Sequence, residues 1–134
     1  MILVDAGPLV ALFHRDDQNH EACVEALREM RDSLVTAWPC VTEAMHLLAF
    51  SSEAQDAVWE ILVTERLQLL PLDAGDAPRM RELMRKYRDL PMDLADAAVV
   101  RLGEREGIRT VFTTDRRDFT VYRPARIGRF TIIP

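Results

Sequence analysis

The chain opens with the stretch Ile2-Leu3-Val4-Asp5-Ala6-Gly7-Pro8, which decides its fold. The first three of these residues are apolar, as is typical of a short strand buried on both faces of a parallel sheet. Gly7 and Pro8 end the strand, and Pro8 suits the first turn of a following helix. A buried strand that leads through Asp5 into a helix predicts a sheet with a site at the carboxyl end of that strand.

Short apolar strands alternate with amphipathic helices along the rest of the chain. The further strands that we expect are Leu34–Thr36, Leu67–Leu70, Thr110–Thr113 and a last, edge strand, Phe130–Ile133. Among the helices between them, one is expected to have its cap at Thr42 and another to begin at Asp93 and end at Gly107. This alternation predicts an α/β fold with a mainly parallel central sheet.

The length and composition are those of one globular domain. The chain has 134 residues, of which 49% are hydrophobic and 29% are charged, and it contains no repeat or linker, so we expect a single domain over residues 1–134. Cys23 and Cys40 have no disulfide or metal-ligand spacing, which indicates buried thiols in a reducing compartment. No apolar run approaches the ~18 residues of a membrane span, and no basic leader is present. We therefore expect a cytoplasmic protein that makes no membrane contact.

Charge is distributed unevenly along the chain. The net charge is −5, yet residues 101–134 hold eight of the 17 Lys and Arg residues and only four of the 22 acids. The overall charge argues against a sequence-blind nucleic-acid coat. The Arg-rich end indicates either a rim that faces a polyanion or a surface for an acidic partner.

Four carboxylates stand at strand ends or helix starts. Asp5 and Asp115 come directly after the first and fourth strands, and Glu43 and Asp96 are expected in the first turns of helices. Because the carboxyl ends of parallel strands meet at one edge of a sheet, we expect these side chains to converge there. Carboxylates a few ångströms apart repel each other, and a hard divalent cation such as Mg²⁺ or Mn²⁺ removes that repulsion.

Each acid also has a purely structural interpretation. Asp5 suits an Asx-turn, and Glu43 would interact favourably with the dipole of its helix. Asp93 is explained as a helix cap, and Asp118 as either a helix cap or a peripheral acid. A metal site is predicted because the acids recur together at strand ends and helix starts.

Four segments, taken in order, resemble the PIN-domain proteins, and most closely the toxin ribonucleases of VapBC-type toxin–antitoxin pairs. The segments are Ile2–Leu9, Thr42–Glu43, Pro91–Ala97 and Thr113–Phe119. The resemblance spans almost the whole chain and implies a three-layer α/β/α PIN-like domain around the central sheet.

The resemblance implies a Mg²⁺-dependent endoribonuclease, with Mn²⁺ as the alternative ion. The residues that it assigns to the metal site are Asp5, Glu43, Asp93, Asp96 and Asp115, all of them except Asp93 also as catalytic residues. In such a site the metal polarises the scissile phosphate and lowers the pKa of a water, which Glu43 or Asp96 would orient. Thr113 matches a hydroxyl residue near the family's site. Arg116 and Arg117 are candidates to bind substrate phosphates, or else ordinary solvated arginines.

The resemblance also implies protein partners. Toxins of this family pair with a small antitoxin whose C-terminal segment lies across the active-site groove, and they commonly form homodimers. The apolar positions that could form such surfaces, or could equally be core, are Leu9, Phe13, Leu47, Phe50 and Trp59. Trp38 and Trp59 are candidates to stack RNA bases or to pack in the core or an interface.

Other functions remain as alternatives. A PIN-like fold without catalysis would be a binding or regulatory subunit. A receiver-like domain would need an acidic pair after an early strand and a lysine at a late strand end, whereas Asp5 stands alone and Lys86, the only lysine, falls in an expected helix. A dehalogenase-type phosphatase would need an acid where Gly7 stands.

Overall fold

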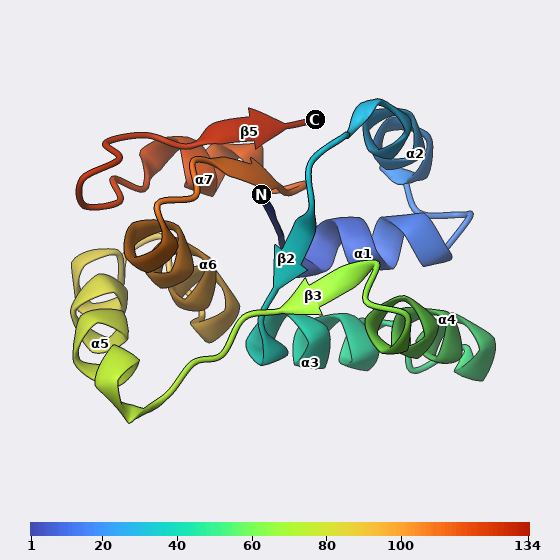
Figure 1. The fold of residues 1–134 in the computed structure, drawn as a ribbon, viewed down its shortest axis with the longest axis horizontal. Helices are drawn as coiled ribbons and strands as arrows, with labels where there is room; N and C mark the ends of the chain where they lie inside the picture. Colours follow the sequence, from blue (N-terminus) through green and yellow to red (C-terminus); the bar gives the residue numbers. More distant parts are fainter.

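The computed structural model describes residues 1–134 and contains one five-stranded sheet in the order β3-β2-β1-β4-β5 (Figure 1). The strands are β1 (Ile2–Val4), β2 (Leu34–Thr36), β3 (Leu67–Leu69), β4 (Thr110–Phe112) and β5 (Thr131–Ile133). Every neighbouring pair is parallel, and β1 lies in the centre. The predicted α/β class with a mainly parallel sheet is confirmed, and β5 lies at an edge, as expected.

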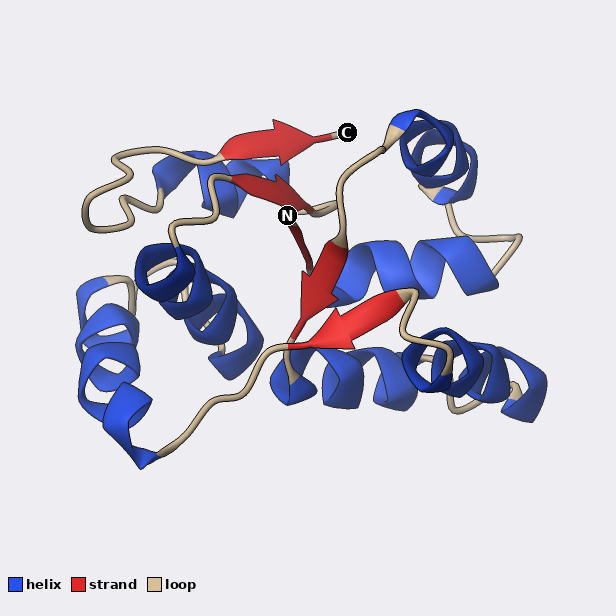
Figure 2. Cartoon of the chain, in the orientation of Figure 1, coloured by secondary structure: helices blue, strands red, loops and turns tan.

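Helices connect the strands (Figure 2). They are α1 (Ala6–Phe13), α2 (His20–Glu29), α3 (Trp38–Leu47), α4 (Ser52–Val63), the 3₁₀ helix η1 (Ala74–Asp76), α5 (Ala77–Lys86), α6 (Leu94–Glu106) and α7 (Arg116–Val121). None of these helices combines the length and the apolar character that crossing a bilayer requires.

The sheet separates two layers of helices, because neighbouring residues of a strand point to opposite faces. In β1, Ile2 and Val4 pack with side chains of α1, α2 and α4, whereas Leu3 packs with those of α5, α6 and α7. Helix α3 contributes to both layers: Val41 packs in the layer that contains Ile2 and Val4, and Cys40 packs in the layer that contains Leu3. Figure 1 shows α5 and α6 on one side of the sheet and α1, α2 and α4 on the other. This is the three-layer α/β/α arrangement that the resemblance implied.

Helix α3 begins earlier than the sequence predicted. Pro39 occupies its first turn, where a missing backbone N–H leaves no hydrogen bond unmade, so the helix starts at Trp38. Thr42, the predicted cap, lies inside the helix, and its hydroxyl donates to the Trp38 carbonyl oxygen at 2.9 Å. Glu43 therefore lies beyond the first turn, and the prediction that placed it in that turn was wrong.

Helix α6 has the predicted cap at each end. The Asp93 carboxylate accepts a hydrogen bond from the Asp96 amide at 2.8 Å, which satisfies one of the free amides of the first turn. Gly107 ends the helix with a φ of 70°, a left-handed conformation that glycine adopts without strain. The two caps fix where the acid-bearing first turn of α6 lies.

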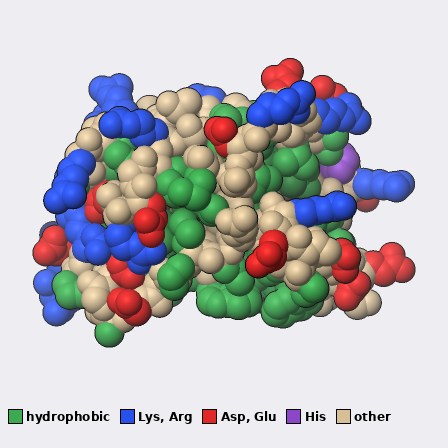
Figure 3. All heavy atoms as spheres, viewed as in Figure 1, with side chains coloured by type: hydrophobic (Ala, Val, Ile, Leu, Met, Phe, Trp, Pro, Cys, Tyr) green, Lys and Arg blue, Asp and Glu red, His purple; other side chains and the backbone are tan.

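Two sets of ion pairs hold helix α6 against α5 and η1, and Figure 3 shows positive and negative side chains intermixed over α5 and α6. The buried Asp76 carboxylate accepts hydrogen bonds from Arg101 and Arg105, each at 2.8 Å. The buried Glu104 carboxylate pairs with Arg79 at 2.7 Å. In both cases a buried negative charge has a positive partner within hydrogen-bond distance, which offsets the cost of removing it from water.

We expect replacement of Gly103 by Ala to destabilise the protein. In an open helix interior, Ala is favoured over Gly by about 1 kcal/mol. Here a Cβ would lie 2.7 Å from the Phe130 ring and 3.1 Å from the Ile108 carbonyl oxygen. Overpacking of this kind costs about 1–3 kcal/mol, so the free energy of unfolding in urea should fall. A Gly103→Ala variant as stable as the wild type would contradict this packing.

Candidate active site

Three helix N-termini meet at the carboxyl edge of the sheet. Asp5 and Asp115 are the N-cap residues of α1 and α7, which follow β1 and β4, and Asp96 lies in the first turn of α6. The N-terminus of a helix carries a partial positive charge, which favours anionic side chains near it. The fold thus gathers carboxylates at the edge that the sequence predicted.

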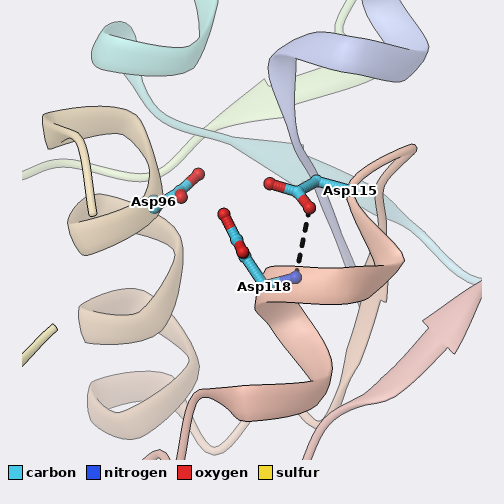
Figure 4. A group of neighbouring side chains, drawn as sticks. All are labelled: Asp96, Asp115 and Asp118. Carbon is cyan, nitrogen blue, oxygen red and sulfur yellow. Dashed lines mark hydrogen bonds between the residues drawn. The ribbon is translucent and has the colours of Figure 1, made fainter. Parts of the chain in front are cut away.

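Three of these carboxylates form a tight cluster: Asp96, Asp115 and Asp118. One oxygen of each lies within 4.8 Å of the other two. Figure 4 shows Asp96 on α6 facing Asp115 and Asp118 at the start of α7. Asp96 is 8% exposed, and the other two are half-buried. We refer to these three residues as the carboxylate cluster.

Helices α6 and α7 present their acids through the same capping arrangement. Asp93 accepts from the Asp96 amide, and Asp115 accepts from the Asp118 amide at 3.1 Å. In each helix, the cap holds the first turn, and a second acid follows three residues later. The structure thus places Asp118, which was predicted to be a helix cap or a peripheral acid, inside the cluster. The repeated Asp-x-x-Asp spacing is the signal that could have found it.

Asp5 is connected to the cluster through Thr113. The Thr113 hydroxyl donates to Asp5 Oδ2 at 2.9 Å and accepts from the Asp115 amide at 3.0 Å. Asp5 is only 6% exposed. Burial raises the pKa of Asp5 to about 6, and the charges of Asp93 and Asp115 add to the rise, while hydrogen bonds from Ala6 and Thr113 oppose it. Thr113 therefore fixes the relative position of two acids.

Asp96 is the most strongly perturbed acid of the cluster. Burial raises the pKa of Asp96 to about 8, and the charges of Asp5, Asp93 and Asp115 contribute to the rise. The hydrogen bond that Tyr122 donates acts in the opposite direction. A carboxyl group in these surroundings retains a proton near neutral pH unless a cation neutralises its neighbours.

Glu43 and Asp93 lie beside the cluster. They line a cavity of about 500 Å³ together with Trp38 and residues around them on α3 and α6. Burial raises the pKa of Glu43 to about 7, with additional contributions from the charges of Asp93 and Asp5. The charge of Asp93 therefore acts on both Glu43 and Asp96, but neither Glu43 nor Asp93 is one of the three members of the cluster.

The tryptophans lie on the surface. Trp38 is 52% and Trp59 is 47% exposed, and their rings meet edge to face with centroids 6.1 Å apart. Interpretation of either as a core residue is therefore wrong. Trp38 borders the cavity that Glu43 and Asp93 line.

The two candidate substrate arginines differ in their surroundings. The Arg116 guanidinium donates to the Ile132 carbonyl oxygen at 3.3 Å and also to that of Pro134, so it is directed at the C-terminal strand. Arg117 is exposed, and its charge opposes the rise in the pKa of Asp118 that burial and Asp115 cause. Arg117 is thus the arginine whose charge acts on the cluster, and substrate binding by either arginine remains a prediction.

The chain matches a known family over most of its length. The family model described as PIN domain matches residues 2–123. The chain therefore belongs to the PIN-domain family. A relative from Mycobacterium tuberculosis, Ribonuclease VapC26, is 33% identical over 135 residues, which cover 99% of this chain and 100% of that protein. Within the family, the chain is thus of the VapC type, as its motifs indicated.

A solved structure has the same fold. It is the crystal structure of Mycobacterium tuberculosis VapC20, described as a Sarcin-Ricin loop cleaving toxin. The TM-score is 0.81, and the match covers 87% of this chain and 92% of that chain at 18% sequence identity. This likeness confirms the fold.

We expect the metal-free protein to lose stability as pH rises. The raised pKa values of Asp5, Glu43 and Asp96 mean that the folded protein retains protons that the unfolded chain has released. The free energy of unfolding in EDTA should therefore fall between about pH 5 and pH 8. Urea titrations at several pH values measure this slope.

Two variants test whether the acids of the candidate site cause this decline in stability with pH. Asp96→Asn should make the decline shallower, because its side chain cannot ionise. Asp56→Asn, which removes an exposed carboxylate on α4, should leave the decline unchanged. Stability that is constant or rises over this pH range would contradict the electrostatics described here.

Proposed function

We propose that this protein is a Mg²⁺-dependent endoribonuclease, the toxin component of a toxin–antitoxin pair, which hydrolyses RNA phosphodiester bonds at the carboxylate cluster. The observation that carries the proposal is the convergence of Asp96, Asp115 and Asp118 within 4.8 Å. The names of its relatives support RNA as the substrate, since one is called a ribonuclease and the other a Sarcin-Ricin loop cleaving toxin. An enzyme with this substrate would act in the cytoplasm.

The donor set fits a hard divalent cation. All atoms that the cluster offers are carboxylate oxygens, which Mg²⁺ and Mn²⁺ prefer. None of the salt bridges of the protein involves an acid of the site, whereas the buried Asp76 and Glu104 each have an arginine partner. Buried acids without a counter-charge are expected where a metal ion supplies one.

Different residues of the site would hold the metal and accept a proton. Asp96, Asp115 and Asp118 would hold the metal together with Asp5, with Mn²⁺ as an alternative to Mg²⁺. When bound, the metal supplies Lewis-acid polarisation of a phosphate oxygen and acidifies a water. The Glu43 carboxylate has a pKa of about 7, which suits a group that accepts a proton near neutral pH.

Other residues would position the site and the RNA. Asp93 would hold the first turn of α6, and Thr113 would hold Asp5 against Asp115. Arg117, which is exposed next to Asp118 along α7, would bind a phosphate that flanks the scissile bond. Arg116 would contribute positive charge from its place against the C-terminal strand.

We expect the protein to cleave RNA only when Mg²⁺ is present. Asp96→Asn and Asp118→Asn should each reduce the cleavage rate about 100-fold or more, because the Lewis-acid contribution of a metal is several kcal/mol. The measurement is the initial rate on structured RNAs with Mg²⁺ and with EDTA. Asp56→Asn, on the surface of α4, is the matched control and should retain the wild-type rate.

Two other results of this cleavage assay would contradict the proposed function. Equal cleavage in EDTA would remove the metal from the mechanism. A folded wild type that cleaves no cellular RNA with either ion would favour the alternative, a non-catalytic PIN-like subunit.

We propose that an antitoxin docks at an apolar groove and extends across the active-site groove. The docking groove is a cavity of about 440 Å³ between α1, α2 and α4, and ten of its 11 lining residues are hydrophobic. Phe13, named as a candidate surface residue, lines this groove, and Leu27 is partly exposed there. Leu9 also lines it but is 1% exposed, so it is chiefly a core residue. An amphipathic helix would bury its apolar face in such a groove.

A homodimer would use different residues. Leu47, Phe50 and Trp59 are large, apolar and exposed on or after α3 and on α4, and we propose that they form its surface. Light scattering of the purified protein tests this, and a monomer mass would contradict it.

We expect the product of a small reading frame that neighbours the gene for this protein to co-purify with the protein after co-expression. Leu27→Asp places a charge in the apolar groove and should raise the dissociation constant about 10-fold or more, since burying an unpaired charge is costly. Val63→Asp, at an apolar residue that is 75% exposed at the end of α4, is the control. Equal binding by both variants would place the antitoxin elsewhere.

A further inference from the structure

Tyr122 is a buried polar residue that the proposed reaction does not use. It follows α7, is 0% exposed, and its hydroxyl donates to Asp96 Oδ2 at 2.6 Å. The short distance is typical of a hydroxyl that donates to a carboxylate. Nothing in the sequence pattern singles out this residue, since 26 positions separate the two partners.

The ring of Tyr122 is fixed by its neighbours. It packs edge to face against Tyr87, with centroids 4.9 Å apart, and against Phe119, with centroids 5.0 Å apart. A ring held on two sides has little freedom to rotate, so its hydroxyl stays at one place next to α6. Asp96, which has a rotatable carboxylate, is thereby held by a rigid group.

Residues at both ends of helix α7 lie next to Asp96. Asp115 and Asp118 stand at its start and form the carboxylate cluster with Asp96, and Tyr122 stands at its end and bonds the same side chain. With Oδ2 engaged by the tyrosine, the Asp96 carboxylate has one oxygen committed to the protein and one that remains to coordinate. Partners of this kind orient metal ligands in other proteins, and their loss typically weakens metal binding about 10- to 100-fold.

We propose that Tyr122 is a positioning residue that orients Asp96 for the divalent cation of the carboxylate cluster. The inference rests on the proposed function, because it assumes that the cluster binds a metal. It goes further by assigning the orientation of one ligand to a residue outside the acidic set.

Tyr87 provides a matched control for the tyrosine hydroxyl. It belongs to the same aromatic group and is also buried, at 7% exposure. Its hydroxyl accepts a hydrogen bond from the Arg123 backbone amide at 2.9 Å rather than donating to an acid. Removal of this hydroxyl disturbs the same core without touching Asp96.

The test compares Tyr122→Phe with Tyr87→Phe. Both variants keep the ring, and circular dichroism and thermal melts in EDTA establish that both are folded. Isothermal titration with Mn²⁺ should give a dissociation constant about 10-fold higher for Tyr122→Phe and unchanged for Tyr87→Phe. The Mg²⁺ concentration for half-maximal RNA cleavage should rise in parallel, with a smaller change in the rate at saturating Mg²⁺.

The outcomes separate this inference from the proposed function. Wild-type affinity for Mn²⁺ in Tyr122→Phe, or equal weakening in Tyr87→Phe, would overturn the positioning role while leaving the metal site in place. A wild-type protein that binds no Mn²⁺ would overturn both.

Discussion

Two buried carboxylates without a counter-charge, Asp5 and Asp96, are the constraint on which the rest of the site depends. The protein treats its other buried acids differently, since Asp76 and Glu104 are each held by arginine. Burial and mutual repulsion raise the pKa of Asp5 to about 6 and that of Asp96 to about 8. Perturbations of this size concentrate at functional sites, and a divalent cation, as proposed above, would relieve them.

The fold keeps these repelling groups together by fixing each from outside. Thr113 holds Asp5 and the backbone of Asp115, and Tyr122 holds Asp96. The sheet and the capped first turns of α6 and α7 supply the rigid frame, and ion pairs clamp α6 against α5. A site built in this way keeps its geometry before any ligand arrives, which is the condition for tight binding of a metal.

Local patterns in the sequence were enough to predict the sheet and most of the acids, because buried parallel strands are short apolar runs and their ends converge. The start of α3 was missed because Thr42 has the chemistry of a cap, although Pro39 decides where that helix begins. Asp118 was missed as a cluster member because Asp115 was treated as a strand end rather than as the cap of a short helix. The Tyr122 contact depends on the packing of α7 against α6, which no local pattern specifies.

The most direct test of a cation at the carboxylate cluster is anomalous diffraction from crystals of this protein grown with Mn²⁺. We expect an anomalous peak bounded by oxygens of Asp96, Asp115 and Asp118, at distances of about 2.0–2.3 Å from its ligands, as is usual for small hard cations. A map with no peak there at saturating Mn²⁺, with arginine or lysine side chains neutralising the three acids instead, would contradict the metal site on which the proposed function rests.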